Sequence, residues 1–142
     1  MRMTHAFMVL AAFALAGALA AEAGQTAAKP DKPDNAKVLG TWAVEVYADG
    51  QSFYLTLLVE ETEGKLTAKA SEQYGMFTDA PASDVSYDGT LLKMALNVPS
   101  PPDGLARPWA VEAKIGEDVM EGVISNAELM ISAGVTGKRT KK

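Results

Sequence analysis

The chain has 142 residues, a formal net charge of −5 at pH 7 and no cysteine. Without a thiol it forms no disulfide, thiolate metal site or cysteine nucleophile. The acidic balance also disfavours a nucleic-acid-binding protein, because such proteins place lysine and arginine against phosphates.

Residues 1–23 have the pattern of a secretory signal peptide. A short segment containing Arg2 leads into an apolar run that ends at Glu22, and this run falls short of the roughly 20 residues that a membrane-spanning helix needs. Small residues allow cleavage after Ala20 or after Ala23. Export with cleavage is favoured over an uncleaved anchor. We therefore expect a periplasmic or extracellular protein with no membrane span after cleavage.

Cleavage would also remove His5, the only histidine of the chain. A mature chain without histidine or cysteine has no Ser-His-Asp or Cys-His pair and lacks the usual histidine ligands of zinc or iron. Glu60, Glu61 and Glu63 lie in one turn without the alternating oxygen ligands of a calcium loop, so we expect them to be solvated. The sequence thus predicts no catalytic residues, no metal site and no cofactor, and an enzyme is the least favoured function.

Residues 24–36 are polar and contain Pro30 and Pro33, and they predict a disordered linker. The folded domain is then expected at residues 37–140. The terminal basic residues, Lys138, Arg139, Lys141 and Lys142, are most simply interpreted as a solvated tail, with a contact to an anion as the alternative.

Within the expected domain, apolar and polar residues alternate with a period of two between glycine-containing turns, as in β-strands. Trp42, Val44 and Val46 share one face of the first segment, and Phe53 and Leu55 share a face of the second. The expected strands span residues 39–47, 52–60, 65–70, 84–87, 91–98, 107–115, 119–125 and 129–136.

No segment with a helical period interrupts these strands, so the predicted fold class is all-β. Short strands at regular spacing favour an eight-stranded antiparallel up-and-down meander. Eight strands are enough to close into a β-barrel whose interior side chains can fill. Closure removes the two exposed edges of an open sheet. An open β-sandwich is the alternative. In a closed meander the first and last strands are neighbours, which brings Trp42 close to Arg139.

Two short motifs carry a resemblance to a known family. Gly40-Thr41-Trp42 near the start of the first strand, together with Gly137-Lys138-Arg139 near the end of the chain, resembles the calycin superfamily of lipocalins, fatty-acid-binding proteins and avidins. The resemblance covers about residues 38–139. Residues 120–124 also resemble segments of uncharacterised bacterial exported domains of this type.

The calycin resemblance implies structural roles for Gly40, Trp42 and Arg139. Trp42 would close one end of the barrel and Arg139 would pack over it in a cation–π contact worth about 0.5–2 kcal/mol. A second lipocalin motif, the helical pair of fatty-acid-binding proteins and the polar side chains that avidins direct at biotin are not found in the sequence. The resemblance therefore implies no particular ligand.

The longest connections, residues 72–81 and 99–104, are expected at the end of the barrel opposite Trp42, where a ligand would enter. The first contains Tyr74, Met76 and Phe77, an unusual composition for an exposed loop. Either this loop closes over the mouth as a lid and contacts the ligand, or its three large side chains cap the core.

The predicted function is the binding of a small apolar or amphipathic molecule inside a secreted barrel. The alternative is a ligand-free structural or protein-interaction module, with a protein partner that the sequence does not identify. Bulky inward residues would fill the interior, whereas alanines such as Ala68, Ala70, Ala113 and Ala133 would leave room, and the sequence contains both kinds.

Trp109 is expected near the rim, either lining the cavity or in the core. The candidate ligand-binding residues are Phe53, Leu55, Tyr74, Met76, Phe77 and Trp109.

Overall fold

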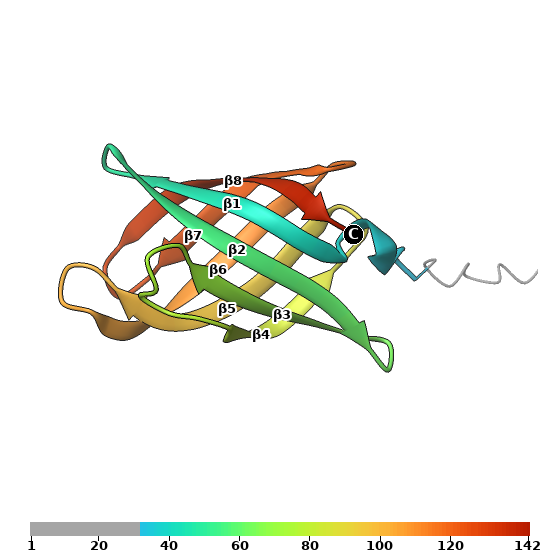
Figure 1. Cartoon of the computed structure of the whole chain (residues 1–142), viewed down its shortest axis with the longest axis horizontal. Coiled ribbons are helices and arrows are strands. Elements are labelled where there is room, and N and C mark those ends of the chain that lie inside the picture. The colour runs from blue at the N-terminus through green and yellow to red at the C-terminus, as the bar shows by residue number, and fades with distance from the viewer. Residues whose placement is uncertain (1–31) are drawn as a thin grey trace, which may run out of the picture. The chain divides into compact units, whose positions relative to one another are not determined.

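The computed structural model describes residues 32–142, so the expected signal peptide and the linker up to residue 31 lie outside the described part. Eight antiparallel strands follow one another in chain order and close into a barrel (Figure 1). The strands are β1 (Gly40–Ala48), β2 (Gln51–Thr62), β3 (Lys65–Glu72), β4 (Ala80–Tyr87), β5 (Leu91–Ser100), β6 (Leu105–Ile115), β7 (Val119–Asn126) and β8 (Ile131–Lys141). The predicted all-β meander barrel is confirmed, and the alternative of an open sandwich is wrong.

Period-two alternation fills the interior of the barrel. In β5, Leu92, Met94, Leu96 and Val98 are buried while Lys93 between them is exposed. Successive side chains of a strand point to opposite faces of the sheet, so one apolar residue in two is enough to build the core. No helix among residues 32–142 is long and apolar enough to span a membrane.

The barrel closes where β1 pairs with β8. Trp42 lies opposite Arg139, and Val44 lies opposite Gly137. A Cβ atom at Gly137 would clash with the side chain of Met120, so glycine leaves the interior space that this methionine fills. β8 continues to Lys141, well beyond its predicted end at residue 136. The terminal basic residues therefore do not form a tail, because Lys138, Arg139 and Lys141 lie on a paired strand, but the lysines are exposed to solvent as expected.

The pairing of β3 with β4 is the weakest of the barrel. These strands pair only through Lys69 with Pro81 and Ala70 with Ala80. β4 begins at Ala80, earlier than the predicted start at residue 84, and its register against β5 shifts between Ser83 and Ser86. The connection between β3 and β4 is accordingly shorter than the sequence predicted.

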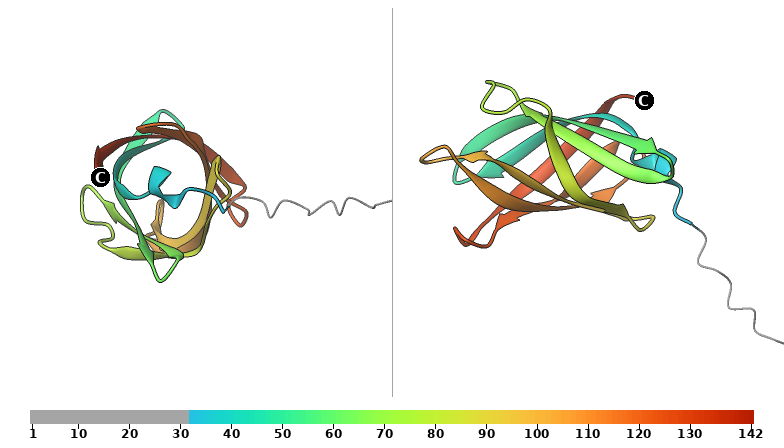
Figure 2. Two further views of the ribbon diagram at one scale, coloured as in Figure 1. Left: turned by 90° about the vertical axis from the view of Figure 1, so that its right-hand side faces the viewer. Right: turned by 90° about the horizontal axis from the view of Figure 1, so that it is seen from below.

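A 3₁₀ helix, η1 (Asn35–Lys37), covers one end of the barrel. Asp34 caps it by accepting a hydrogen bond from the Ala36 backbone N–H, and Figure 2 shows the helix within the outline of the barrel when viewed from this end. Asn35 and Ala36 therefore belong to the ordered domain, although the sequence placed them in the linker.

Candidate ligand-binding site

Trp42 closes the end of the barrel that η1 covers. Its side chain is completely buried, and its Nε1 donates a hydrogen bond to the Val38 carbonyl oxygen at 2.9 Å. The Arg139 guanidinium lies 4.4 Å from the centroid of the indole ring. The same guanidinium donates to the backbone carbonyls of Lys37 and Leu39, and its Nε lies 3.0 Å from a carboxylate oxygen of Asp118. This is the packing of tryptophan and arginine that the calycin resemblance implies.

Gly40 allows the last strand to approach at this end. Its φ angle of 116° is one that residues with a side chain rarely adopt. A Cβ atom at this position would also overlap the Lys141 backbone carbonyl oxygen. Glycine is therefore required both by the backbone conformation and by the closing of β1 against β8.

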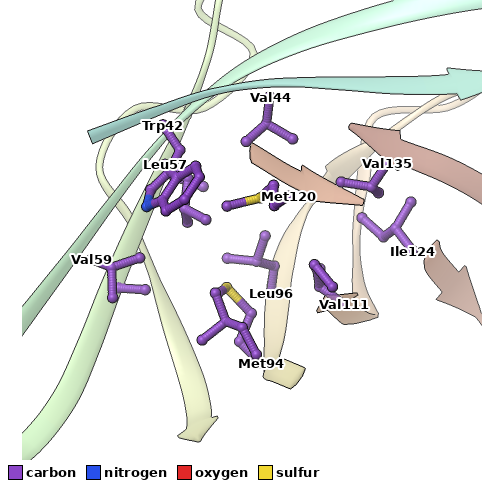
Figure 3. Close-up of a cluster of buried hydrophobic side chains, with 14 of the residues drawn as sticks. Trp42, Val44, Leu57, Val59, Met94, Leu96, Val111, Met120, Ile124 and Val135 are labelled. Atoms are coloured by element: carbon purple, nitrogen blue, oxygen red, sulfur yellow. The ribbon is translucent and has the colours of Figure 1, made fainter. Parts of the chain in front are cut away.

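The half of the barrel next to Trp42 is filled by side chains. Figure 3 shows Trp42, Leu57 and Met120 converging in the interior, with Met94 and Val111 beside them. The space that remains beside Leu57, Met94 and Met120 is about 20 Å³. A cavity of this size holds about one water molecule, so no organic ligand fits in this half.

A larger cavity lies at the opposite end, with a volume of about 300 Å³. This volume is at the lower limit of the roughly 300–1,000 Å³ that is usual for small-molecule pockets. Side chains from seven of the eight strands face it, together with the connections after β1, β3 and β5. The wall residues on strands are Val46, Ala48, Gln51, Phe53, Leu55, Glu72, Leu96, Val98, Pro99, Ser100, Trp109, Ile124, Ile131 and Ala133.

The structure brings most of the predicted ligand-binding residues to this cavity. Phe53, Leu55 and Trp109 line it from the strands, and Met76 and Phe77 line it from the connection between β3 and β4. The Trp109 Nε1 donates to the Ser100 Oγ at 2.6 Å, which orients the indole against the wall. Large apolar side chains from distant parts of the chain thus surround one small space.

Tyr74 does not reach the cavity. The residue is 83% exposed in the connection between β3 and β4. Gly75, with a φ angle of 80°, turns the backbone between Tyr74 and Met76 and directs the two side chains apart. The prediction of Tyr74 as a ligand-binding residue therefore lacks support from the geometry.

Glu72 holds the connection that carries Met76 and Phe77. Its Oε2 accepts hydrogen bonds from the backbone N–H groups of Tyr74, at 2.8 Å, and Met76, at 3.1 Å. The Glu72 backbone N–H donates to the Phe77 carbonyl at 2.9 Å. The strand predicted from the sequence ended at Ala70, so Glu72 was not among the candidate site residues. The alternation of Ala68, Ala70 and Glu72 is the signal that would have placed it on the inward face.

An ion pair fixes the second long connection at this end. The Arg107 guanidinium makes two hydrogen bonds of 2.6 Å to the two carboxylate oxygens of Asp103. The hydrogen bonds from Arg107 hold the pKa of the Asp103 carboxyl far below its ordinary value. Arg107 does not line the cavity. Its charge therefore stabilises the loop and is not free to attract an anion.

The cavity wall carries acidic groups and no basic ones. Asp49 and Glu72 are its ionisable residues, and it contains no lysine, arginine or histidine. Within residues 32–142 no group of three or more histidine, cysteine, aspartate or glutamate residues is arranged to hold a metal ion. The cavity is therefore lined mainly by apolar side chains, and its ionisable residues are both acidic.

The chain matches no protein-family model, and searches of curated proteins and of solved structures find no significant similarity to it.

Proposed function

We propose that this chain is an exported calycin-like barrel that binds a small, largely apolar molecule in the cavity at its open end. The observation that carries the proposal is the apolar cavity of about 300 Å³ opposite the end closed by Trp42. The basic and then apolar segment at residues 1–23 supports export. The Gly40, Trp42 and Arg139 packing supports the calycin-like assignment.

The filled half of the barrel limits the shape of the ligand. Leu55, Leu96 and Ile124 border both the large cavity and the small residual space below it, so they form the floor of the large cavity. A ligand that rests on this floor has only the upper part of the barrel for its apolar body. This geometry favours a compact molecule over a long extended acyl chain.

Native mass spectrometry of residues 24–142, purified without detergent from the protein's own host, tests the proposal. We expect an additional mass of a few hundred daltons that is lost on denaturation. Ala133→Leu adds bulk to the cavity wall and should reduce ligand occupancy. Gly134→Ala is the matched control, since an added methyl group at Gly134 meets nothing within 4 Å. Bare protein from several gentle preparations, with no binding of added apolar probes, would contradict the proposal.

A protein-interaction module is the second candidate, and exposed apolar side chains on the outer face of the barrel favour it. Tyr47 and Val123 lie on either side of Gly134 in the paired strands β1, β8 and β7, and both side chains are exposed. Tyr54 and Val119 are exposed on the same group of strands, β2 to β1 to β8 to β7. In the same mass spectrometry experiment, a bare mass that is a clean multiple of the monomer would favour this second function.

A further inference from the structure

Glu72 is a buried carboxyl group in the wall of a largely apolar cavity. Only 7% of its surface is exposed. It lies opposite Leu55 in the pairing of β2 with β3, and directly opposed residues of antiparallel strands point to the same face. Since Leu55 lines the cavity floor, Glu72 also points into the barrel. A carboxylate is costly to bury in apolar surroundings unless it is paired.

The carboxylate of Glu72 is only half satisfied by the protein. Oε2 accepts the two backbone hydrogen bonds from Tyr74 and Met76. Oε1 accepts no hydrogen bond from residues 32–142. In this part of the chain, no fully buried side-chain oxygen or nitrogen lacks a partner, so Oε1 must remain accessible. One oxygen therefore fixes the loop, while the other has no partner among residues 32–142, and the residue that carries both oxygens lines the cavity.

The surroundings of Glu72 favour a cation over an anion. Asp49 is the only other ionisable residue of the wall, and it carries the same sign of charge. Arg107 is at the same end of the barrel, but its guanidinium is paired with Asp103. Charges in a cleft with apolar walls act more strongly than in water, so a carboxylate ligand would be repelled and an ammonium ligand attracted.

We infer that the ligand is an amphipathic cation, with an apolar body in the cavity and an ammonium or similar charged N–H donor bound to Oε1 of Glu72. This inference rests on the proposed function and adds the chemical class of the ligand. A charge-assisted hydrogen bond from an ammonium group would satisfy the free carboxylate oxygen and balance the buried charge. Fatty acids carry the opposite charge and do not fit this wall.

Three compounds with the same alkyl chain and different head groups test the inference. Octylamine is cationic at pH 7, octan-1-ol is neutral and octanoate is anionic. Each is titrated against residues 24–142 loaded with the neutral fluorescent probe N-phenyl-1-naphthylamine. We expect octylamine to displace the probe at a concentration about tenfold or more below that of octanoate, with octan-1-ol between them.

Glu72→Gln tests whether Glu72 causes this preference. Glutamine keeps the length of the side chain and an oxygen that can accept from the loop, and it removes the charge. The variant should lose most of the advantage of octylamine over octanoate. Glu60→Gln, at an exposed position on β2, is the matched control and should keep it.

The outcomes separate this inference from the proposed function. If the unaltered chain binds octanoate as well as octylamine, the inference is overturned and the apolar binding function stands. An octylamine preference that persists in Glu72→Gln overturns the assignment to Glu72. If neither the probe nor any of the three compounds binds, the proposed function fails, and this inference fails with it. Where Glu72→Gln does not fold, the order of the three compounds in the unaltered chain still decides whether the ligand is a cation.

Discussion

Arg139 joins several parts of the closed end through one guanidinium. It stacks on Trp42, donates to the carbonyls of Lys37 and Leu39 at the end of η1 and just after it, and forms an ion pair with Asp118. Its side chain is 5% exposed, so these partners replace nearly all of its hydration. Because arginine stays charged and has five donors in a fixed plane, lysine could not make the same set of contacts.

Trp42→Ala should reduce the free energy of unfolding by about 3–5 kcal/mol, the usual cost of truncating a buried tryptophan. The side chain is fully buried and its removal leaves Arg139 without its stacking partner. Urea denaturation monitored by circular dichroism measures the change. Trp109→Ala, at the partly buried cavity wall, should cost less. A loss below about 1 kcal/mol at Trp42 would show that it does not close the barrel.

The sequence predicted some site residues and missed others for local reasons. Trp42 and Arg139 were predicted to meet because meander topology makes the first and last strands neighbours. Tyr74 was grouped with Met76 and Phe77 by composition, but the turn at Gly75 separates their directions. Glu72 was missed because a period-two pattern of alanines gives no clear strand end, and a glutamate after it resembles a loop residue.

At the scale of single strands, close packing between neighbours restricts β7. Gly122 lies between Ala113 on β6 and Val135 on β8. A Cβ atom at Gly122 would overlap the Glu112 backbone carbonyl oxygen and approach the Ala113 Cα at 2.6 Å. The neighbour in each case is backbone, which cannot move without disturbing the β6–β7 pairing. This glycine therefore allows the two strands to approach as closely as they do.

Gly122→Ala should destabilise the protein by about 1–3 kcal/mol or more, as overpacking in a well-packed region does. Gly134→Ala, on the adjacent strand with open space around it, should be neutral or stabilise by up to about 1 kcal/mol through the unfolded chain. Thermal unfolding of both variants under the same conditions checks the difference. Equal melting temperatures would refute the close-packing explanation.

The start of β4 shows why strand boundaries were harder to predict than strand number. Ala80, Pro81 and Ala82 do not alternate between apolar and polar residues, and proline removes a donor for pairing. Asp84 has a φ angle of 52°, and the register against β5 shifts around it. A bulge of this kind changes which face each residue occupies, so a period-two pattern does not continue through it.

At the scale of the whole molecule, closure of the barrel depends on the last residues of β8. Deleting residues 139–142 removes Arg139 and the pairing of Lys141 with Thr41. The lost cation–π contact and charged hydrogen bonds should lower the free energy of unfolding by about 2–5 kcal/mol. The uncovered edge of β1 should also promote self-association, which size-exclusion chromatography would detect.

Deletion of Lys142 alone is the control for this truncation. Lys142 lies beyond the end of β8, so its removal should change the free energy of unfolding by less than about 0.5 kcal/mol. If the two deletions gave the same unfolding curve and the same elution volume, the terminal segment of β8 would not be needed to close the barrel.

Strand number and order were predictable at this scale, but the interior volume was not. The eight-stranded meander follows from evenly spaced strands with short turns. The volume depends on where large and small inward residues meet across the barrel. Trp42, Leu57 and Met120 gather in one half, while Ala133 and Ala48 border the cavity in the other. Which inward residues meet across the barrel depends on the relative stagger of the strands. The period-two pattern of a single strand carries no information about that stagger.

The covered end of the barrel holds both the first described residues and the end of the chain. The Lys37 carbonyl at the end of η1 accepts a hydrogen bond from Arg139, whereas the cavity lies at the opposite end of the barrel. A tag, a surface linkage or a reporter protein attached after Lys142 would therefore leave the open end of the barrel unobstructed. A protein immobilised through its C-terminus would thus keep the cavity turned away from the surface that holds it.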